Sequence, residues 1–298
     1  MDENIAATAR LTLGADPERF IFNESGELVP VCGWLGGTKK NPVPLGPGLN
    51  KLFVQEDNIM AEYNIPPASN REGFARSIQT AEKYLLLRVR DTNAGYYVST
   101  ACSAIVSNRL VATTLGADMF GCSAEFDAYT EGGEVPTPRM RMIGADEYGE
   151  PTSQERYAGG HLHLGITVND EYVQRIPRYV LAALCDASIG LCAAPHDKQG
   201  GRRAVYGQAG RFRPTKYGIE YRVLSNFWTN DPMYSLLVAD SAFKLMRFVT
   251  REKMSTIHSV FDDIPWGAVR EAINTEDAGA AHALYSHIWN ELTGRLAA

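Results

Sequence analysis

Residues 206–228, YGQAGRFRPTKYGIEYRVLSNFW, carry the strongest structural signals in this chain. Arg211 and Arg213 stand on alternate residues, and a Tyr-Gly turn then leads into a segment of β-branched, aromatic and aliphatic residues that predicts a strand. Glu220 and Arg222 lie two residues apart in this strand, so their side chains share one face. A carboxylate among guanidinium groups suits a site for Mg²⁺ and a nucleotide phosphate. An ion-paired strand on a solvated sheet face is the alternative.

The composition excludes several classes of protein. The chain has 298 residues, of which 45% are hydrophobic and 21% charged, as in a globular protein of one large or two small domains. Its net charge of −6 argues against a nucleic-acid binder that relies on bulk positive charge. The five cysteines form no CxxC pair, which favours reduced thiols, and neither a secretory signal nor an 18-residue apolar run is present. We therefore expect a cytoplasmic protein with no nucleic-acid or membrane partner.

A pair of acids near the amino terminus interrupts an otherwise apolar segment, LTLGADPERFIF at residues 11–22. Asp16 and Glu18 fall on the same side of an extended chain, and Pro17 between them breaks the strand or places it at an edge. Two carboxylates on one face repel each other unless a cation neutralises them. The pair is either part of a metal site or a turn, because Asp-Pro commonly opens turns.

Further acids follow in two strand-like segments. Residues 52–67, LFVQEDNIMAEYNIPP, carry Asp57, Glu62 and Asn64 before a Pro-Pro stop. Glu125 and Asp127 lie two apart in SAEFDAY. Each is a candidate ligand for a cation or a contact for a substrate.

Two histidines form the second strong signal, in the segment AGGHLHLG at residues 158–165. His161 and His163 project from the same face of a strand, and the glycines allow a ligand or another backbone to approach closely. Because no HExxH helix or Cys-His ligand set accompanies them, zinc is not indicated. The many carboxylates favour a site for Mg²⁺ or Mn²⁺.

Helices and long loops alternate with these strands. Gly33–Asn50, with Lys39 near its centre, and Thr130–Gln154 are rich in glycine and proline and predict long loops that border a site. Hydrophobic spacing and capping residues predict helices at 71–90, 170–188, 232–251, 265–274 and 276–296. No GxGxxG or Walker loop is present, which weighs against a Rossmann or P-loop enzyme.

In this order, the motifs resemble those of the phage-type carboxylate–amine ligases of the glutamine synthetase and glutamate–cysteine ligase superfamily. The resemblance spans residues 14–230, and it rests on Gly-x-Asp-Pro-Glu (14–18), Asp-Asn-x-x-x-Glu-x-Asn-x-Pro-Pro (57–67), Gly-Cys-x-x-Glu-Phe (121–126), Ala-Gly-Gly-His-x-His (158–163) and Tyr-Gly-x-Glu-Tyr-Arg-x-x-Ser-Asn-Phe-Trp (217–228).

This resemblance implies an α+β fold, a curved antiparallel sheet of glutamine-synthetase catalytic type with helices packed on its outer face. It implies a single catalytic domain over 1–298, with a core at about 11–230 and a helical part at about 231–298. The concave face would bind ATP and two or three Mg²⁺ or Mn²⁺ ions. ATP would phosphorylate a carboxylate, and an amine would attack the acyl phosphate to give an amide.

The resemblance also implies roles for individual residues. Metal ligands would be Asp16, Glu18, Glu62, His161 and Glu220. Catalytic roles would fall to Arg222, Arg213 and Glu62, and ATP contacts to His163, Arg211, Arg213 and Arg222. Asp57 and Asn64 would contact the substrate or, for Asp57, a metal, and Glu125 is a further candidate for a substrate contact from its position in the sequence alone. Two features depart from the family pattern. The first acid is Asp16 rather than Glu, with Pro17 stiffening the strand between the acids, and Glu125 and Asp127 have no aligned counterpart in the family.

Two other functions are compatible with these residues. A phosphotransferase is one, because guanidino kinases have a related sheet, and a non-catalytic nucleotide-binding or virion-associated protein is the other. For the ligase, the expected partners are a small-molecule or peptide carboxylate and an amine, and the site would act in the cytoplasm, of a host cell if a phage encodes the chain. The motifs specify neither the two substrates nor the oligomeric state.

Overall fold

The computed structural model describes residues 9–117, 125–136, 140–169, 171–198 and 201–296. The strands that build and border the site are β1 (Arg10–Ala15), β2 (Glu18–Arg19), β3 (Ile21–Phe22), β4 (Val43–Pro44), β5 (Phe53–Asp57), β6 (Met60–Asn64), β7 (Tyr97–Val98), β8 (Ser103–Ser107), β9 (Glu125–Asp127), β10 (Gly133–Val135), β11 (Arg141–Ile143), β12 (Ser153–Tyr157), β13 (Leu162–Val168), β14 (Glu171–Tyr172), β15 (Arg211–Thr215) and β16 (Gly218–Tyr221).

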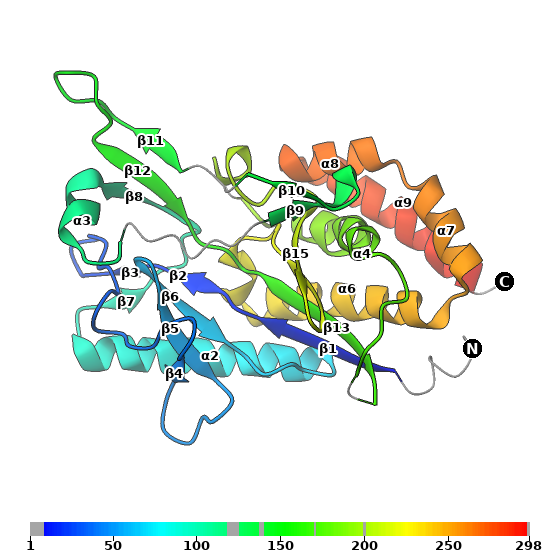
Figure 1. Cartoon of the computed structure of the whole chain (residues 1–298), viewed down its shortest axis with the longest axis horizontal. Helices are drawn as coiled ribbons and strands as arrows, with labels where there is room; N and C mark the ends of the chain where they lie inside the picture. Colours follow the sequence, from blue (N-terminus) through cyan, green and yellow to red (C-terminus); the bar gives the residue numbers. More distant parts are fainter. Residues whose placement is uncertain (1–8, 118–124, 137–139, 170, 199–200, 297–298) are drawn as a thin grey trace.

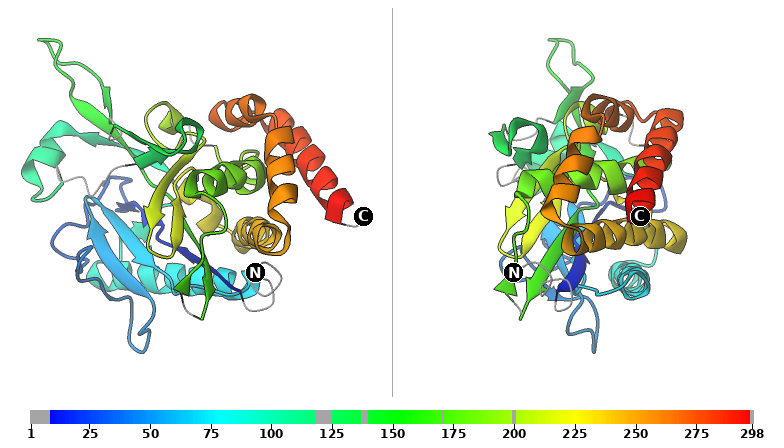
Figure 2. Two further views of the ribbon diagram at one scale, coloured as in Figure 1. Left: turned by 45° about the vertical axis from the view of Figure 1, so that its right-hand side comes forward. Right: turned by 90° about the vertical axis from the view of Figure 1, so that its right-hand side faces the viewer.

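The α-helices are α2 (Arg71–Thr92), α3 (Asn108–Thr113), α4 (Arg178–Cys185), α5 (Leu191–Ala193), α6 (Pro232–Arg251), α7 (Met254–Asp263), α8 (Trp266–Asn274) and α9 (Ala278–Leu296). Figure 1 shows α2 and α6 side by side along one face of the strands, and Figure 2 shows α7, α8 and α9 gathered at the far side of α4 and α6.

The main sheet has the order β1-β13-β16-β15-β9-β10, and β14 pairs with β13. Every pair in it is antiparallel. A second antiparallel sheet has the order β2-β6-β5-β4. The β8, β12 and β11 strands form a further sheet beside α3, on the side of the molecule away from α7, α8 and α9 (Figure 1).

Backbone hydrogen bonds connect the first two sheets at the break between β1 and β2. Pro17 has no N–H, but its carbonyl accepts from Tyr63 N at 3.2 Å, and the carbonyl of Ala15 accepts from Ile65 N at 3.2 Å. β2 then pairs with β6 in a register that sets Glu18 opposite Glu62. Backbone bonding therefore runs from β4 to β10 across one bent antiparallel surface. The predicted α+β fold class, an antiparallel sheet with helices packed on its outer face, is confirmed.

Side chains along the main sheet alternate between a helix-covered face and an open face. The helix-covered face is apolar and fully buried, and includes Leu13, Leu162, Leu164, Phe212, Ile219 and Tyr221. α4 contacts β15 and β16 there, and α6 contacts β1 and β13. Because side chains in a strand alternate with period two, the intervening polar residues must face the other way. This alternation places the charged motifs on the face of the sheet opposite the helices.

Most of the predicted helices are confirmed. α2 starts where Asn70 caps it by accepting from Gly73 N at 2.8 Å, and α6 begins with Pro232 in its first turn. α8 and α9 match the helices predicted at 265–274 and 276–296.

The helix predicted at 170–188 is wrong in its first turns. Glu171 and Tyr172 instead extend the main sheet by pairing with β13, and α4 begins at Arg178 directly after Pro177. The helical path then continues past residue 188 through a π-helical turn at Asp186–Gly190 into α5. Pairing with the edge of β13 outweighed the helical spacing of residues 173–176.

Two other segments differ from expectation. The strand-like segment at 52–67 is a hairpin, because Asn58 adopts a left-handed conformation with φ of 58° and turns β5 into β6. The predicted loop at 130–154 contains β10 and β11. The first four residues of the Gly-Cys-x-x-Glu-Phe motif, 121–124, lie outside the described residues.

No helix in the described part of the chain is long and apolar enough to cross a membrane. Cys32, Cys102, Cys185 and Cys192 are free thiols, in agreement with the reduced state that we expected, and Cys122 lies outside the described residues.

Candidate active site

The site begins with a row of residues that are directly opposite one another on adjacent strands. Gly14 of β1 pairs with His163 of β13, His163 pairs with Glu220 of β16, and Glu220 pairs with Arg213 of β15. Directly paired residues in an antiparallel sheet project to the same face, about 5 Å apart. The sheet register therefore assembles histidine, carboxylate and guanidinium groups from distant parts of the chain.

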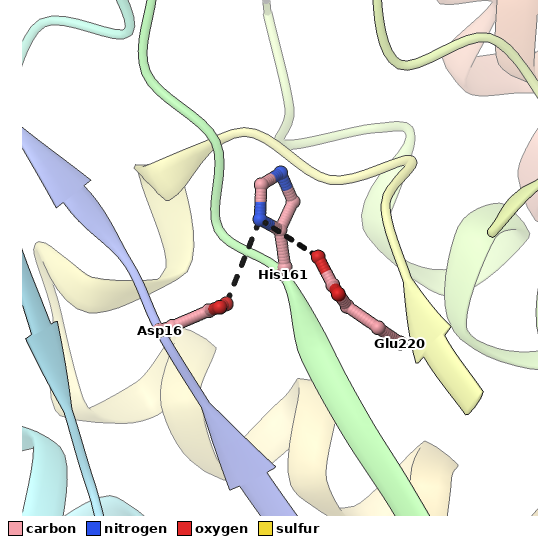
Figure 3. Close-up of side chains that lie close together, drawn as sticks. All are labelled: Asp16, His161 and Glu220. Carbon is pink, nitrogen blue, oxygen red and sulfur yellow. Dashed lines mark ion pairs between the residues drawn. The ribbon is translucent and has the colours of Figure 1, made fainter. Parts of the chain in front are cut away.

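Asp16, His161 and Glu220 form the first of two candidate cation-binding groups among the described residues, and we name it cluster one. Figure 3 shows the carboxylates of Asp16 and Glu220 approaching the same ring nitrogen of His161 from two sides. The Nδ1 atom of His161 lies 3.5 Å from an oxygen of each carboxylate. One potential ligand atom from each residue lies within 4.8 Å of the others. Two carboxylate oxygens and an imidazole nitrogen form a donor set suited to Mg²⁺ or Mn²⁺.

The two glycines before His161 make this arrangement possible. A β-carbon on Gly159 would lie 2.3 Å from Nε2 of His161, and one on Gly160 would lie 2.3 Å from the carbonyl oxygen of Ser225. The backbone of Gly159 also donates to a carboxylate oxygen of Glu18 at 2.7 Å. The Gly-Gly sequence thus lets the chain pass close to the imidazole and orients an acid of the neighbouring sheet.

Glu18, Asp57 and Glu62 form the second group, cluster two, whose potential ligand atoms also lie within 4.8 Å of one another. Glu18 and Glu62 face each other across the β2–β6 pair, and Asp57 comes from the end of β5. Glu18 is 8% exposed and Glu62 5%, so water screens their mutual repulsion poorly. Gln55 donates to Glu62 at 2.8 Å and holds its carboxylate in place.

The two clusters differ in how their charge is balanced. Burial and then the charges of Asp16, Asp57 and Glu18 raise the pKa of Glu62 well above its ordinary value. Burial is also the largest cause of the raised pKa of Glu18. A divalent cation would remove this repulsion, so the residues of cluster two fit such an ion.

Cluster one, in contrast, is already surrounded by positive charge. Burial opposes the ionised form of Glu220, but the adjacent Arg222 outweighs it and keeps the pKa of Glu220 below its ordinary value. Burial likewise opposes ionisation of Asp16, yet His163 and His161 hold the pKa of Asp16 below its ordinary value. Both acids of cluster one are therefore carboxylates at neutral pH.

Arg213 and Arg222 approach Glu220 from two sides. Arg213 Nη1 lies 3.1 Å from one oxygen of Glu220, and Arg222 donates to the other oxygen through Nη1. Arg222 also donates to Glu125 through Nε at 2.6 Å. Glu220 is 3% exposed and Arg222 4%, which rules out the alternative of a solvated sheet face.

The two clusters and both arginines line a single cavity. Its lining also includes Lys39 from the long loop at 33–50 and Tyr157 from β12. The candidate cation ligands and the two guanidinium groups thus face one partly open cavity.

His163 lies beside this cavity, in contact with cluster one. Its Nε2 atom is 3.1 Å from Asp16, and its Nδ1 atom is 2.5 Å from the hydroxyl of Tyr217. Both ring nitrogens of His163 therefore have a polar neighbour, and one of these neighbours is the Asp16 carboxylate.

The structure does not bring every candidate residue into the cavity. Arg211 is not among the described residues that line the cavity. Its guanidinium instead binds Gln208 at 2.7 Å and lies 3.7 Å from Asp127. Asp127 itself caps a turn by accepting from Tyr129 N at 2.9 Å. Asn64, at the end of β6, also lies outside the described lining. Glu125 reaches the site only through Arg222.

Three residues of the site were missed by sequence reasoning. Gln55 supports Glu62, Tyr217 supports His163, and Tyr206 contacts both His161 and Arg222. Alternation along residues 52–57 places Gln55 on the same face as Asp57, a signal that was available. The contacts of Tyr206 depend on the path of a loop, which no local pattern specifies.

Residues 148–295 match the model of a family described as Phage phiEco32-like COOH.NH2 ligase-type 2. This match covers about half of the chain and confirms the resemblance to the phage-type carboxylate–amine ligases. His161, Arg213, Glu220 and Arg222 lie inside the matched part. Asp16 and the acids of cluster two precede it, and the sheet brings them to the same cavity. No curated protein matches the sequence.

Solved structures similar to this chain include one titled as a novel glutamine synthase homolog, with a TM-score of 0.36 and 12% identity over 98% of this chain and 70% of that chain. Others are a GmaS/ADP complex (TM-score 0.37, 12% identity, 99% of this chain and 73% of that one) and apo GmaS without ligand (TM-score 0.39, 11% identity, 98% and 72%). These TM-scores are too low to support an inference about fold or function. The fold class is established by the strands and helices described above.

Proposed function

We propose that this protein, whose residues 148–295 match the phage COOH.NH2 ligase family, is an ATP-dependent carboxylate–amine ligase that forms an amide bond through an acyl phosphate. The observation that carries the proposal is the arrangement of two cation-binding clusters and two arginines around one cavity. Phosphoryl transfer requires neutralised charge and a fixed geometry rather than a protein nucleophile.

Each of the two clusters would bind one cation. Asp16, His161 and Glu220 would hold one Mg²⁺ or Mn²⁺ ion, and Glu18, Asp57 and Glu62 would hold a second. When bound, these ions neutralise the phosphates of ATP and the carboxylate that receives the phosphoryl group. The protein's own part is to keep the six ligands on a rigid sheet, largely shielded from water.

The two arginines would neutralise the negative charge on the phosphates that the cations do not neutralise. Arg213 and Arg222 line the cavity beside cluster one, where a transferring phosphoryl group would lie, and Lys39 faces the same volume from the 33–50 loop. ATP would phosphorylate a substrate carboxylate, and an amine would then attack the acyl carbon. The new C–N bond forms as the bond to phosphate breaks, and ADP and phosphate are the products.

A direct test uses hydroxylamine as the amine. Purified protein with ATP and Mg²⁺ is screened against panels of carboxylates, and ADP release and hydroxamate formation are both measured. A ligase gives hydroxamate in proportion to ADP, and a Glu220→Ala variant that remains folded gives neither. A stable phosphorylated product without hydroxamate would instead identify a phosphotransferase.

The same preparation tests the non-catalytic alternative. A ligand that binds only the folded state raises its stability by RT ln(1 + [L]/Kd), so nucleotide and Mg²⁺ should raise the melting temperature of this protein. Absence of any shift at high ligand concentration would refute the nucleotide-dependent function altogether.

A further inference from the structure

The hydroxyl of Tyr206 joins the two functional halves of the site. Its oxygen lies 2.5 Å from Nε2 of His161 and accepts from Nη2 of Arg222 at 2.7 Å. His161 belongs to cluster one, and Arg222 is the arginine that also binds Glu220 and Glu125. One oxygen atom is thus shared by a candidate metal ligand and a candidate phosphate ligand.

The hydrogen-bond pattern favours cation binding at the opposite nitrogen of His161. Nδ1 is the atom that faces the carboxylates of Asp16 and Glu220. A neutral imidazole that holds a cation through Nδ1 carries its hydrogen on Nε2, and the oxygen of Tyr206 is placed to accept that hydrogen. Such an outer partner fixes the ring orientation of a metal-binding histidine.

The surroundings of Tyr206 keep its ring in place. The guanidinium of Arg202 lies over the ring at 4.5 Å and is itself fully buried. Arg202 donates to the carbonyls of Val223 at 2.8 Å and Leu224 at 3.0 Å, directly after Arg222 in the chain. A β-carbon on Gly207 would lie 1.9 Å from Arg202, so only glycine leaves room for this stack. The tyrosine and the backbone beyond Arg222 are held by the same side chain.

We propose that Tyr206 is a positioning residue that couples cation binding at cluster one to the orientation of Arg222. The proposal rests on the proposed function, because it takes cluster one as a cation site and Arg222 as a phosphate ligand. A cation that orders His161 also orders the hydroxyl, and the hydroxyl fixes one of the two terminal nitrogens of Arg222. Cation binding then tightens nucleotide binding beyond the direct attraction between the two ligands.

The test measures binding rather than turnover. Mn²⁺ affinity is measured by electron paramagnetic resonance, and ADP affinity by calorimetry with and without Mn²⁺, for the wild type and for Tyr206→Phe. We expect the variant to bind Mn²⁺ 10- to 100-fold more weakly, the range found for loss of an outer partner of a metal ligand. The factor by which Mn²⁺ tightens ADP binding should fall as well, since that factor is the coupling between the two sites.

Tyr129→Phe is the matched control. The hydroxyl of Tyr129 also donates to a carboxylate, that of Asp186 at 2.7 Å, but Tyr129 is not among the described residues that line the cavity. This variant should keep the wild-type Mn²⁺ affinity and the wild-type coupling factor. The nitrogen modulation of the Mn²⁺ spin echo adds a signature of the bound imidazole, which His161→Asn should abolish and Tyr206→Phe should alter.

The outcomes separate the two proposals. If the wild type binds Mn²⁺ and ADP cooperatively and Tyr206→Phe does the same with equal constants, the positioning role of Tyr206 is refuted and the ligase proposal stands. If the wild type binds neither, the proposed function fails and the inference fails with it. Should Tyr206→Phe not fold, Arg222→Lys provides the second test, because it removes the nitrogen that bonds to Tyr206. It should lower the coupling factor and leave the nitrogen modulation from His161.

Discussion

Replacing Glu62 with glutamine should make the metal-free protein more stable and should reduce the stability that Mg²⁺ adds. Glutamine has the shape of a protonated glutamate, and its carbonyl oxygen can still accept from Gln55. The change removes only the charge that Glu18 and Asp57 repel. Two unit charges 4.8 Å apart, the outer limit for the ligand atoms of cluster two, repel by about 3.5 kcal/mol at an effective dielectric constant of ~20.

The pH dependence follows from the raised pKa of Glu62. A carboxyl group whose pKa is higher in the folded state contributes stability that is complete below its unfolded-state pKa and is lost as the pH rises through its folded-state pKa. Each unit of that difference corresponds to about 1.4 kcal/mol. In EDTA, Glu62→Gln and the wild type should therefore differ least at pH 5, and the variant should be more stable at pH 9, by about 1–3 kcal/mol.

Urea denaturation at pH 5, 7 and 9, in EDTA and in excess MgCl₂, measures these differences. At Mg²⁺ concentrations near 100 times its dissociation constant, the wild type should gain about 2.7 kcal/mol, and the variant clearly less. Glu134→Gln, on an exposed residue of β10, controls for the loss of one negative charge. An unchanged pH profile in EDTA, or an equal gain from Mg²⁺ in both proteins, would show that Glu62 is not part of a cation site.

Three further changes test other parts of the site. Gly159→Ala should lower Mn²⁺ affinity at least 10-fold, measured by magnetic resonance, because its β-carbon would lie 2.3 Å from His161, and wild-type affinity would contradict this. Asp186, held by two tyrosine hydroxyls, has its pKa raised to about 7 by burial, so the wild type should lose up to about 4 kcal/mol of stability between pH 4 and 7. Denaturation of Asp186→Asn should lack this slope, and parallel profiles would refute the assignment. Arg213→Gln should weaken ADP binding at least 10-fold in calorimetry while Arg211→Gln changes it less than 2-fold, since only Arg213 lines the cavity and loss of a charged hydrogen bond costs about 1.5–3 kcal/mol. Equal effects of the two would place both guanidinium groups on the nucleotide.

Much of the sheet could be predicted because it depends on alternation. Glu220 and Arg222, and His161 and His163, are each two residues apart, so period two alone placed each pair on one face. Pro17 correctly indicated a break between Asp16, which follows β1, and Glu18 of β2, because proline cannot donate to a strand partner.

The features of the site that the sequence did not predict depend on the contacts that side chains make in the folded chain. Arg211 has the same strand phase as Arg213, yet Gln208 and Asp127 hold its guanidinium away from the cavity. The position of a residue in a strand predicts the face to which its side chain projects. It does not predict the partner that the end of a long side chain binds. Tyr206 was missed because it lies in a loop, and only the folded chain brings this loop next to His161.

The pairing of β1 with β13 has a consequence for how the chain is made. Thr12 contacts Gly165, 153 residues later, so at synthesis rates of 5–20 residues per second β1 waits roughly 8–30 s for its partner strand. An unpaired strand edge invites association with other chains, and charged residues on such an edge oppose it. Asp16 and Glu18, which directly follow β1, would oppose such association before β13 emerges, because they repel the same acids of another chain.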